Sequence, residues 1–555
     1  MSVPSSLLGP LDLLAFPVNV ESVLAHMRQD MRDDWFADAL QHSDLFSRVD
    51  DLKSVIQEIL LEGNGQYDGA ARTLCDIPKK GLGIRYSLET DFYDRFVYQA
   101  ICTYLIPFFD PLLSSRVLGH RFNPRREKEK YLFKNRIDLW RTFEGVTHTA
   151  ISGGQALLVT DLLNYFENIS IDVVQRSFEG LLPKVKASGV EKLRIRNAIR
   201  TLCALLCKWG YSDRHGLPQN RDPSSFIANV VLNDIDRKMV EMGYDYYRYV
   251  DDIRVITPTV GDARRAIVDL VGELRRVGMN VNSAKTKIIS AASDEADVVE
   301  IFVSGDDRIA TIDNMWRSRS RRVIARSVQY IVDLLKVCIE ERESQSRQFR
   351  FAINRLLQLV EIDVFDIRSA VADELLHVLV GSLPDHPAST DQYCRVIAAL
   401  APADEVMNTI AAYLCDDHLA MHPWQNYHIW MMFARLEFTN DALLNTALRR
   451  LRANSTSPEG AAVFVYLSCI NEKERLGEFI PVFEADWPYR HQRHFLIATH
   501  GLPAAQLKPI VAKLGVRLRG TANRARPYFE RPDRPLVKQE SPQLADLYDE
   551  VSHYD

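Results

Sequence analysis

The chain has 555 residues, 46% of them hydrophobic and 26% charged, a composition that predicts a globular protein of about three domains and excludes a fibrous or disordered one. Its formal net charge is −6 at pH 7, so binding of long nucleic acid cannot involve the whole surface and must be local. The eight cysteines are scattered without a CxxC pair, which argues against a disulfide framework or zinc site. No long apolar run and no signal-peptide pattern appear, and we expect a cytoplasmic protein that does not enter a membrane.

Residues 1–60 are expected to form short helices, because 20–24 and 52–56 carry apolar residues at helical spacing. Further along, residues 156–160 form an apolar run of buried-strand length that ends at Asp161. The run predicts a core strand with a carboxylate at its end.

Residues 246–256 predict a β-hairpin, since strand-forming residues stand on both sides of Asp251 and Asp252. Adjacent aspartates occur at four other places in the chain, and such a pair is usually a solvated turn. An acidic hairpin tip that lies beside a carboxylate at the end of a core strand is more informative than a lone Asp pair. That arrangement can hold two divalent ions about 3.5–4 Å apart, as two-metal phosphoryl transfer requires.

Six consecutive blocks of this sequence resemble the motifs of reverse transcriptases. They follow one another in the family's order between residue 77 and about residue 290. They are 77–85 (fingers), 94–121 (the block after it), 161–166 (motif A), 216–225 (motif B), 249–252 (motif C) and 278–286 (motif D).

The resemblance implies a magnesium site. It assigns both Mg²⁺ ions to Asp161 and Asp251, with Asp252 as the supporting carboxylate and the backbone carbonyl of Leu162 beside them. One ion would lower the pKa of the primer hydroxyl and the other would neutralise charge on the triphosphate. Lys285 matches the motif D lysine, a proton donor to the leaving pyrophosphate.

The resemblance also implies a nucleotide site. Lys79 and Arg85 match the fingers cations that hold the triphosphate, with Lys80 as an alternative to Lys79. Phe166 stands where the family has an aromatic gate against the ribose 2′-hydroxyl, although it could also be a core aromatic. Gln219 is expected to contact the nucleotide sugar.

Two residues near these motifs depart from the family pattern or leave alternatives open. Asn220 occupies a motif B position where the family usually has glycine. Asn tolerates unusual dihedrals, so the turn can survive, but the ordinary template-base pocket is in doubt. Arg254 shares a strand face with Asp252 and either pairs with that carboxylate or meets a nucleic-acid phosphate.

Beyond Trp316 the pattern is helical, with breaks at prolines and a unit length typical of a HEAT-like α-solenoid. The basic run with Arg317, Arg319, Arg321 and Arg322 is expected to follow nucleic-acid phosphates, with a merely solvated face as the alternative. Helices are expected at 328–339, 351–360, 367–380, 394–400, 406–414, 424–436, 442–451 and 461–470.

The expected fold class is α+β: right-hand polymerase fingers and palm, followed by an all-α helical-repeat (HEAT-like) C-terminal domain. Four parts are expected. They are an N-terminal helical region (1–60), fingers and palm (61–315), a helical-repeat domain in place of a conventional thumb (316–519), and a Pro- and charge-rich tail (520–555).

A palm followed by a long helical domain resembles the abortive-infection and defence-associated (unknown-group) reverse transcriptases of bacteria. The resemblance implies an antiviral DNA polymerase that uses deoxynucleoside triphosphates, binds RNA and/or DNA, and forms a homo-oligomer. Its synthesis would be untemplated or directed by a noncoding RNA, and could start on a protein hydroxyl. The alternatives are an ordinary RNA-templated enzyme of retron or group II intron type, and an inactive palm that serves as a binding module.

Overall fold

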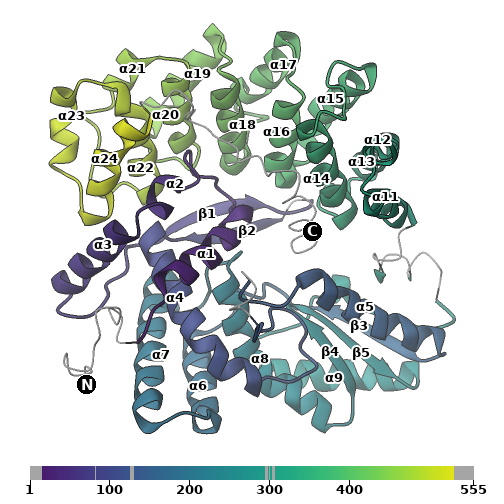
Figure 1. Cartoon of the computed structure of the whole chain (residues 1–555). Helices are drawn as coiled ribbons and strands as arrows, with labels where there is room; N and C mark the ends of the chain where they lie inside the picture. Colours follow the sequence, from purple (N-terminus) through teal and green to yellow (C-terminus); the bar gives the residue numbers. More distant parts are fainter. Residues whose placement is uncertain are drawn as a thin grey trace.

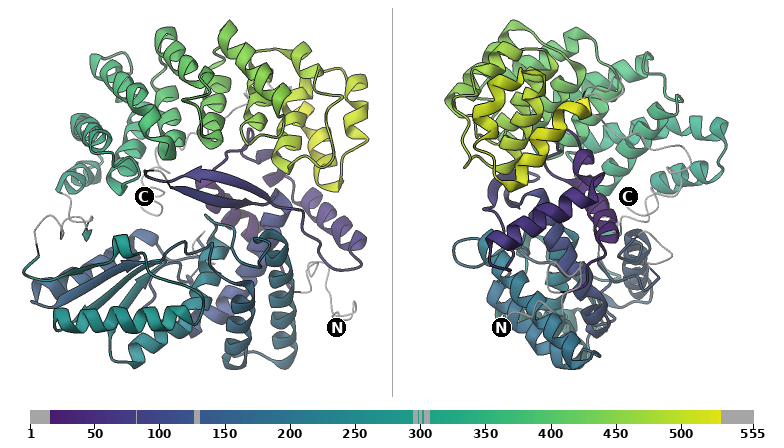
Figure 2. Two further views of the ribbon diagram at one scale, coloured as in Figure 1. Left: turned by 180° about the vertical axis from the view of Figure 1, so that it is seen from behind. Right: turned by 60° about the vertical axis from the view of Figure 1, so that its left-hand side comes forward.

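The computed structural model describes residues 16–529 apart from 82, 126–130, 294–297, 299–300 and 303–306. It has two halves, and an arch of helices from the C-terminal half faces an antiparallel sheet with its own helices (Figure 1). The β1–β2 hairpin lies between them, as the view from behind also shows (Figure 2, left). Mixed α+β architecture is therefore confirmed.

The central sheet is antiparallel with strand order β4-β5-β3-β6. Helices α8 (Asp222–Glu241) and α9 (Val260–Arg275) cover one face, and α5 (Arg136–Ser152) covers the other. Burial on both faces explains the continuous apolar run before Asp161, because a half-exposed strand would alternate. The strands are β3 (Ala156–Asp161), β4 (Asp245–Tyr249), β5 (Asp252–Thr257) and β6 (Lys287–Ile289).

The remaining elements that precede α8 lie outside this sheet. Helices α1 and α3 lie where helical spacing predicted them, and the buried helix α4 packs on α1, α7 and α8. Strands β1 and β2 pair antiparallel. The bounds are α1 (Val20–Asp30), α2 (Ser43–Phe46), α3 (Val49–Glu62), β1 (Thr73–Pro78), β2 (Ile84–Glu89), α4 (Phe92–Phe109), α6 (Ile171–Leu181) and α7 (Gly189–Trp209).

The C-terminal half is helical throughout its described residues and is built in two layers. Helices α14, α16, α18, α20, α22 and α24 pack each on the next, and α13, α15, α17 and α19 form a second row. All eight helices expected from the sequence are present. The bounds are α11 (Asp307–Arg317), α12 (Arg321–Ala325), α13 (Ser327–Glu340), α14 (Arg347–Glu361), α15 (Ala370–Ser382), α16 (Thr390–Ala399), α17 (Asp404–Cys415), α18 (Pro423–Leu436), α19 (Asp441–Ala453), α20 (Gly460–Cys469), α21 (Lys473–Gly477), α22 (Tyr489–Ala498), α23 (Ala504–Val511) and α24 (Val516–Phe529).

The ends of this half differ from the expected limits of 316 and 519. Helix α11 begins at Asp307, and its Ile312 and Trp316 belong to the helical core. Helix α24 continues to Phe529, into the segment expected to be a tail, because it packs on α2, α3 and α22. The rest of that tail, 530–555, lies outside the described residues.

The N-terminal region is divided between the two halves instead of forming a unit of its own. Phe36 and Leu40 pack in the C-terminal helical core, whereas the buried faces of α1 and α3 pack in the core of the sheet unit. Trp35 accepts hydrogen bonds at its carbonyl from Trp424 Nε1 (2.6 Å) and His428 Nε2 (2.9 Å) of α18. This segment therefore joins the two halves.

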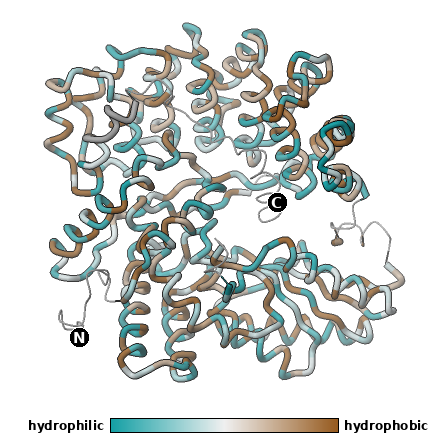
Figure 3. Tube along the Cα trace, in the orientation of Figure 1, coloured by the Kyte–Doolittle hydropathy of each residue, from teal (hydrophilic) through white to brown (hydrophobic). Residues whose placement is uncertain are grey.

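A buried arginine reinforces the joint. Arg493 of α22 donates to Asp38 at 2.7 and 2.9 Å and to Asp44 at 2.7 and 3.1 Å, and all three side chains are at most 4% exposed. Hydrophobic residues alternate with hydrophilic ones along the helices of both halves (Figure 3). Within the described ranges, no helix is long and apolar enough to cross a lipid bilayer.

We predict that Arg493→Met lowers the free energy of unfolding by about 3–5 kcal/mol, because it leaves Asp38 and Asp44 buried without their cation. Chemical denaturation followed by circular dichroism measures the change. Arg452→Met is the matched control, since its partner Glu478 is exposed and such pairs contribute little. Equal effects of the two changes would contradict the assigned role of Arg493.

Candidate active site

Three carboxylates meet where β3 and β5 lie side by side. Asp161 is the last residue of β3 and stands directly opposite Asp252, the first residue of β5. Tyr249 pairs with Asp252, which leaves a two-residue loop of Val250 and Asp251. The predicted acidic hairpin is confirmed, and the pairing of β3 with β5 brings Asp161 to its tip.

Burial and neighbouring carboxylates raise the pKa of Asp251 and of Asp252. Burial, followed by the charges of Asp252 and Asp161, raises the pKa of Asp251 to about 8. Burial and the charge of Asp161 raise the pKa of Asp252 to about 6. Such a group of ionised carboxylates needs a counter-cation.

One cation is supplied by Lys285, whose Nζ lies 2.5 Å from Asp161 Oδ2. Although burial acts in the opposite direction, this hydrogen bond and the neighbouring carboxylates raise the pKa of Lys285. The other oxygen of Asp161, Oδ1, is buried and accepts no hydrogen bond from the described residues. Leu162 is bridged to Val281, which brings the segment before Lys285 beside β3.

The donors fit a divalent ion in chemistry, because they are hard carboxylate oxygens, one of them with no hydrogen bond. Within the described part of the chain, however, no three acidic, histidine or cysteine side chains are already gathered in metal-binding geometry. The ammonium group of Lys285 contacts one oxygen of Asp161.

The residues expected to bind nucleotide take up different positions. Arg85 is partly buried on the ring of Trp35, with its guanidinium carbon 5.3 Å from the ring centroid. Burial lowers its pKa, and the charges that oppose this are those of Asp251 and Glu167. Arg85 therefore lies near the carboxylates, whereas Lys80 forms an ion pair with Glu343 before α14.

Phe166 and Gln219 lie on the segments expected from the motifs. Phe166 is partly exposed, while the neighbouring Tyr165 is 5% exposed and packs in the core. Gln219 Nε2 donates to the Tyr86 carbonyl (3.3 Å) and to Glu167 Oε1 (3.2 Å). The side-chain amide of Gln219 is thus held between the β1–β2 hairpin and the segment that follows Asp161.

Comparison with known families decides the class of the sheet unit. Residues 113–351 match the family model described as "Reverse transcriptase (RNA-dependent DNA polymerase)". The chain contains a reverse transcriptase domain. The matched range includes the three carboxylates and Lys285, but it begins after Lys79, Lys80 and Arg85. A search of curated proteins found no match.

Solved structures of telomerase show a loose likeness. Apo telomerase from Candida tropicalis truncated from its C-terminal domain is 12% identical with a TM-score of 0.27, over 44% of this chain and 55% of that one. Telomerase from Candida albicans with a fragment of telomeric RNA is 11% identical with a TM-score of 0.28, over 68% and 65%. Apo telomerase from Candida tropicalis is 12% identical with a TM-score of 0.30, over 72% and 68%. The chain thus spans 55–68% of the length of these telomerase chains.

Motif B of the reverse transcriptase domain keeps its turn despite the missing glycine. Asn220 adopts a left-handed conformation with φ of 54°, which asparagine tolerates better than most residues. Its carbonyl accepts a hydrogen bond from Arg221 Nη1 (2.8 Å), and the buried Arg221 also reaches Asp34 (3.0 Å) and Glu89 (3.1 Å). Asp34 and Glu89 thus fix Arg221 and, through it, the motif B turn.

Arg254 fulfils neither of the two roles expected for it. Its guanidinium donates to Thr147 Oγ1 (2.7 Å) and the Ile301 carbonyl (2.9 Å) and lies 4.6 Å from the Phe143 ring centroid. It is 4% exposed, so it cannot meet a phosphate, and it influences Asp252 only through its charge. Burial lowers the pKa of Arg254 to about 10. Arg254 is buried because α5 covers the face of β5 on which strand alternation places this side chain.

Arg347 was not predicted from the sequence and comes from the helical half. It begins α14 and lies 3.8 Å from the Trp140 ring centroid, and its charge lowers the pKa of Asp252, although burial dominates that pKa. No local motif marks this position, because the residues it meets lie more than ninety positions away. The expected phosphate-binding arginines (317, 319, 321, 322) are exposed on or beside α11 and α12. Arg321 donates to the carbonyls of Ile362 and Asp363, which directly follow α14.

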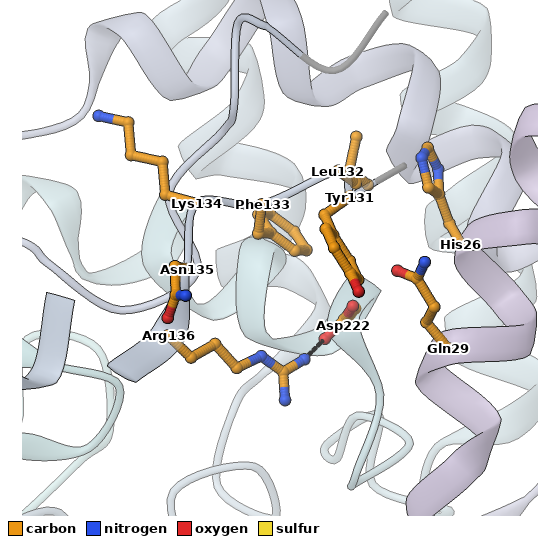
Figure 4. Close-up of a pocket in the computed structure, with 9 residues that line it drawn as sticks. All are labelled: His26, Gln29, Tyr131, Leu132, Phe133, Lys134, Asn135, Arg136 and Asp222. Atoms are coloured by element: carbon orange, nitrogen blue, oxygen red, sulfur yellow. Dashed lines mark hydrogen bonds and ion pairs between the residues drawn. The ribbon is translucent and has the colours of Figure 1, made fainter. Parts of the chain in front are cut away.

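A small cavity of about 20 Å³ lies behind motif B, between α1 and the start of α8 (Figure 4). Arg136 points to Asp222 across one side of it, and His26 and Gln29 of α1 lie on the other. A space of this size accommodates about one water molecule. It is therefore too small for a nucleotide.

We predict that a metal-free protein loses stability as pH rises from about 4 to about 8. The raised pKa of Asp251 means that the folded state binds more protons than the unfolded state in this window, so its stabilising contribution is complete below pH 4 and is lost as pH rises through 8. Asp251→Asn should show a smaller loss between pH 5 and 9. Thermal melting in the presence of a chelator measures it.

The control for this series is Asp234→Asn, at an exposed position of α8. It should follow the wild-type protein at each pH. Parallel pH profiles of the wild-type protein and Asp251→Asn would refute the raised pKa.

Proposed function

We propose that the protein adds deoxynucleotides to a nucleic-acid or protein primer at the site formed by Asp161, Asp251 and Asp252, with two Mg²⁺ ions. The observation that carries the proposal is the pairing of β3 with β5, which places Asp161 opposite Asp252 beside the turn. These carboxylates, with the Leu162 carbonyl, would hold the ions. When bound, the ions activate the primer hydroxyl and neutralise charge on the triphosphate.

Lys285 is proposed to act after the metal ions bind. Its ammonium group, which lies 2.5 Å from Asp161, would leave that carboxylate and move to the triphosphate. Free to reach the triphosphate, it can donate a proton to the departing pyrophosphate. The protein's contribution is then positioning and electrostatics.

The nucleotide is proposed to lie between the β1–β2 hairpin and the carboxylates. Arg85, near Asp251 and Glu167, would hold the triphosphate, with Lys79 or Lys80 at the hairpin tip. Gln219 would meet the sugar, and the partly exposed ring of Phe166 would clash with a ribose 2′-hydroxyl.

The helical half is proposed to replace the thumb as a HEAT-like repeat domain, with Arg317, Arg319, Arg321 and Arg322 as phosphate contacts. Support comes from its two-layered stacking and from Arg347, which reaches the ring of Trp140 beside the site. The combination of domains supports a role in bacterial antiphage defence as a homo-oligomer. Synthesis would be untemplated or directed by a noncoding RNA.

Protein priming is part of this proposal, with a tyrosine hydroxyl as the first acceptor. Tyr548 and Tyr554 are candidates from the sequence, and both lie outside the described residues. DNA that stays with the protein in denaturant and is released by protease supports priming. Freely migrating DNA contradicts it.

We predict that Asp251→Ala lowers DNA synthesis by the purified protein by at least about 10³-fold, because a metal ligand acts mainly on the transition state. The measurement is incorporation of labelled deoxynucleotides with Mg²⁺, with folding checked by circular dichroism. Asp234→Ala is the matched control and should remain active. Normal synthesis by Asp251→Ala would refute the proposed site.

The sequence of the DNA product distinguishes a defence-type enzyme from a retron- or intron-type reverse transcriptase. Homopolymeric or random DNA, or a copy of one co-purifying noncoding RNA, supports the defence-type enzyme. Faithful copying of any added RNA supports the retron or intron type.

We predict that Phe166→Ala raises the use of ribonucleotides relative to deoxynucleotides by about tenfold or more, because it removes the proposed gate. Competition between the two nucleotide classes in single-nucleotide addition measures the ratio. Tyr165→Phe is the control, since its ring is in the core and it should leave the ratio unchanged. If Phe166→Ala changes the rate but not the ratio, Phe166 is not the gate.

A further inference from the structure

Behind the Val250–Asp251 turn lies a buried arginine that the proposed chemistry does not use. Arg248, in β4, is fully buried, as is its ion-pair partner Asp236 of α8. Arg248 Nε and Nη2 donate to the two carboxylate oxygens of Asp236 at 2.8 and 2.7 Å. Nη1 donates to Asn229 Oδ1 (2.9 Å) and to the carbonyl of Val250 (2.8 Å).

The partners of Arg248 are themselves fixed. Tyr246 donates its hydroxyl to Asp236 Oδ1 (2.8 Å), and Asn229 Nδ2 donates to the Gly119 carbonyl (2.9 Å). Gly119 lies so close to the turn that a Cβ there would be 2.8 Å from the Val250 nitrogen. The network therefore connects α8, the segment around Gly119 and the turn.

The turn needs such support because of its backbone. Val250 has φ of 58°, a left-handed conformation that β-branched residues rarely adopt and that surrounding structure must enforce. Its carbonyl belongs to the peptide that leads directly into Asp251. A hydrogen bond from Arg248 to this carbonyl thus fixes the direction in which the Asp251 side chain leaves the turn.

We propose that Arg248 is a positioning residue, which acts through the Val250 carbonyl to aim Asp251 at the reacting groups. The proposal rests on the proposed function. Stability alone does not require an ion pair here, because apolar residues of similar volume often serve as well as a buried pair. Lysine cannot replace it, since one ammonium group cannot reach both Asp236 oxygens, Asn229 and Val250 in the geometry of the guanidinium.

The test is Arg248→Lys, compared with Tyr246→Phe, which removes one hydrogen bond from the same Asp236 but leaves Arg248 in place. We expect Arg248→Lys to lower kcat for single-nucleotide addition by about tenfold to a hundredfold, because small misplacement of a reacting group is costly. The KM for nucleotide should stay within about twofold. Tyr246→Phe should change both constants by less than about threefold.

Hydrogen exchange gives a readout that does not depend on polymerase activity. Amides of the peptide covering 248–253 should exchange at least about tenfold faster in Arg248→Lys than in Tyr246→Phe, with the rest of the sheet unchanged. If Arg248→Lys does not fold, Asn229→Ala replaces it and should show the same pattern at smaller size.

Two outcomes overturn the proposal. One is a kcat of Arg248→Lys equal to that of Tyr246→Phe in folded protein. The other is exchange at the turn that does not differ between the two variants. A wild-type protein that makes no DNA under any condition instead refutes the proposed function. Even then, hydrogen exchange at the turn that is equal in Arg248→Lys and Tyr246→Phe would show that Arg248 does not brace the turn.

Discussion

Repulsion among Asp161, Asp251 and Asp252 is the constraint around which the active-site region is organised. Burial and the neighbouring carboxylates raise the pKa of Asp251 and Asp252, so positive charge must come close before these two groups can remain ionised. The chain brings that charge from separate segments: Lys285 contacts Asp161, Arg85 reaches in from the β1–β2 hairpin, and Arg347 comes from the helical half. The proposed metal ions would add to this positive charge. Without them, Lys285, Arg85 and Arg347 partly compensate the charge of the carboxylates.

Contacts between the two halves also support the active-site region. The segment around Trp35 accepts hydrogen bonds from α18 at its backbone and carries Arg85 on its indole ring. A few residues later, Asp38 and Asp44 fix it to Arg493 of α22. The helical half therefore supports the β1–β2 hairpin and, through it, the proposed nucleotide site. These contacts give the helical half a structural role in the other half of the molecule.

Much of the fold follows from local pattern. The core strand before Asp161, the hairpin at Asp251 and the eight expected helices of the C-terminal half are all present, because apolar periodicity and turn residues decide them locally. Limits set by packing were predicted less well. Helix α11 begins before 316 and α24 continues past 519 because both pack on neighbours that are distant in the sequence. The same is true of Arg254, whose strand face was predicted correctly but whose cover, α5, was not.

The amino-acid sequence alone indicated the likeness to reverse transcriptase motifs, the alternation of strands and helices, and which carboxylates stand at strand ends. Motif order and periodicity are short-range properties and can be read directly. The folded arrangement alone reveals that Arg254 is buried, that Arg347 comes near Asp252, and that Arg248 holds the turn through Asp236 and Asn229. These contacts join residues through packing, and no local pattern encodes which distant side chain will supply the partner of a buried charge.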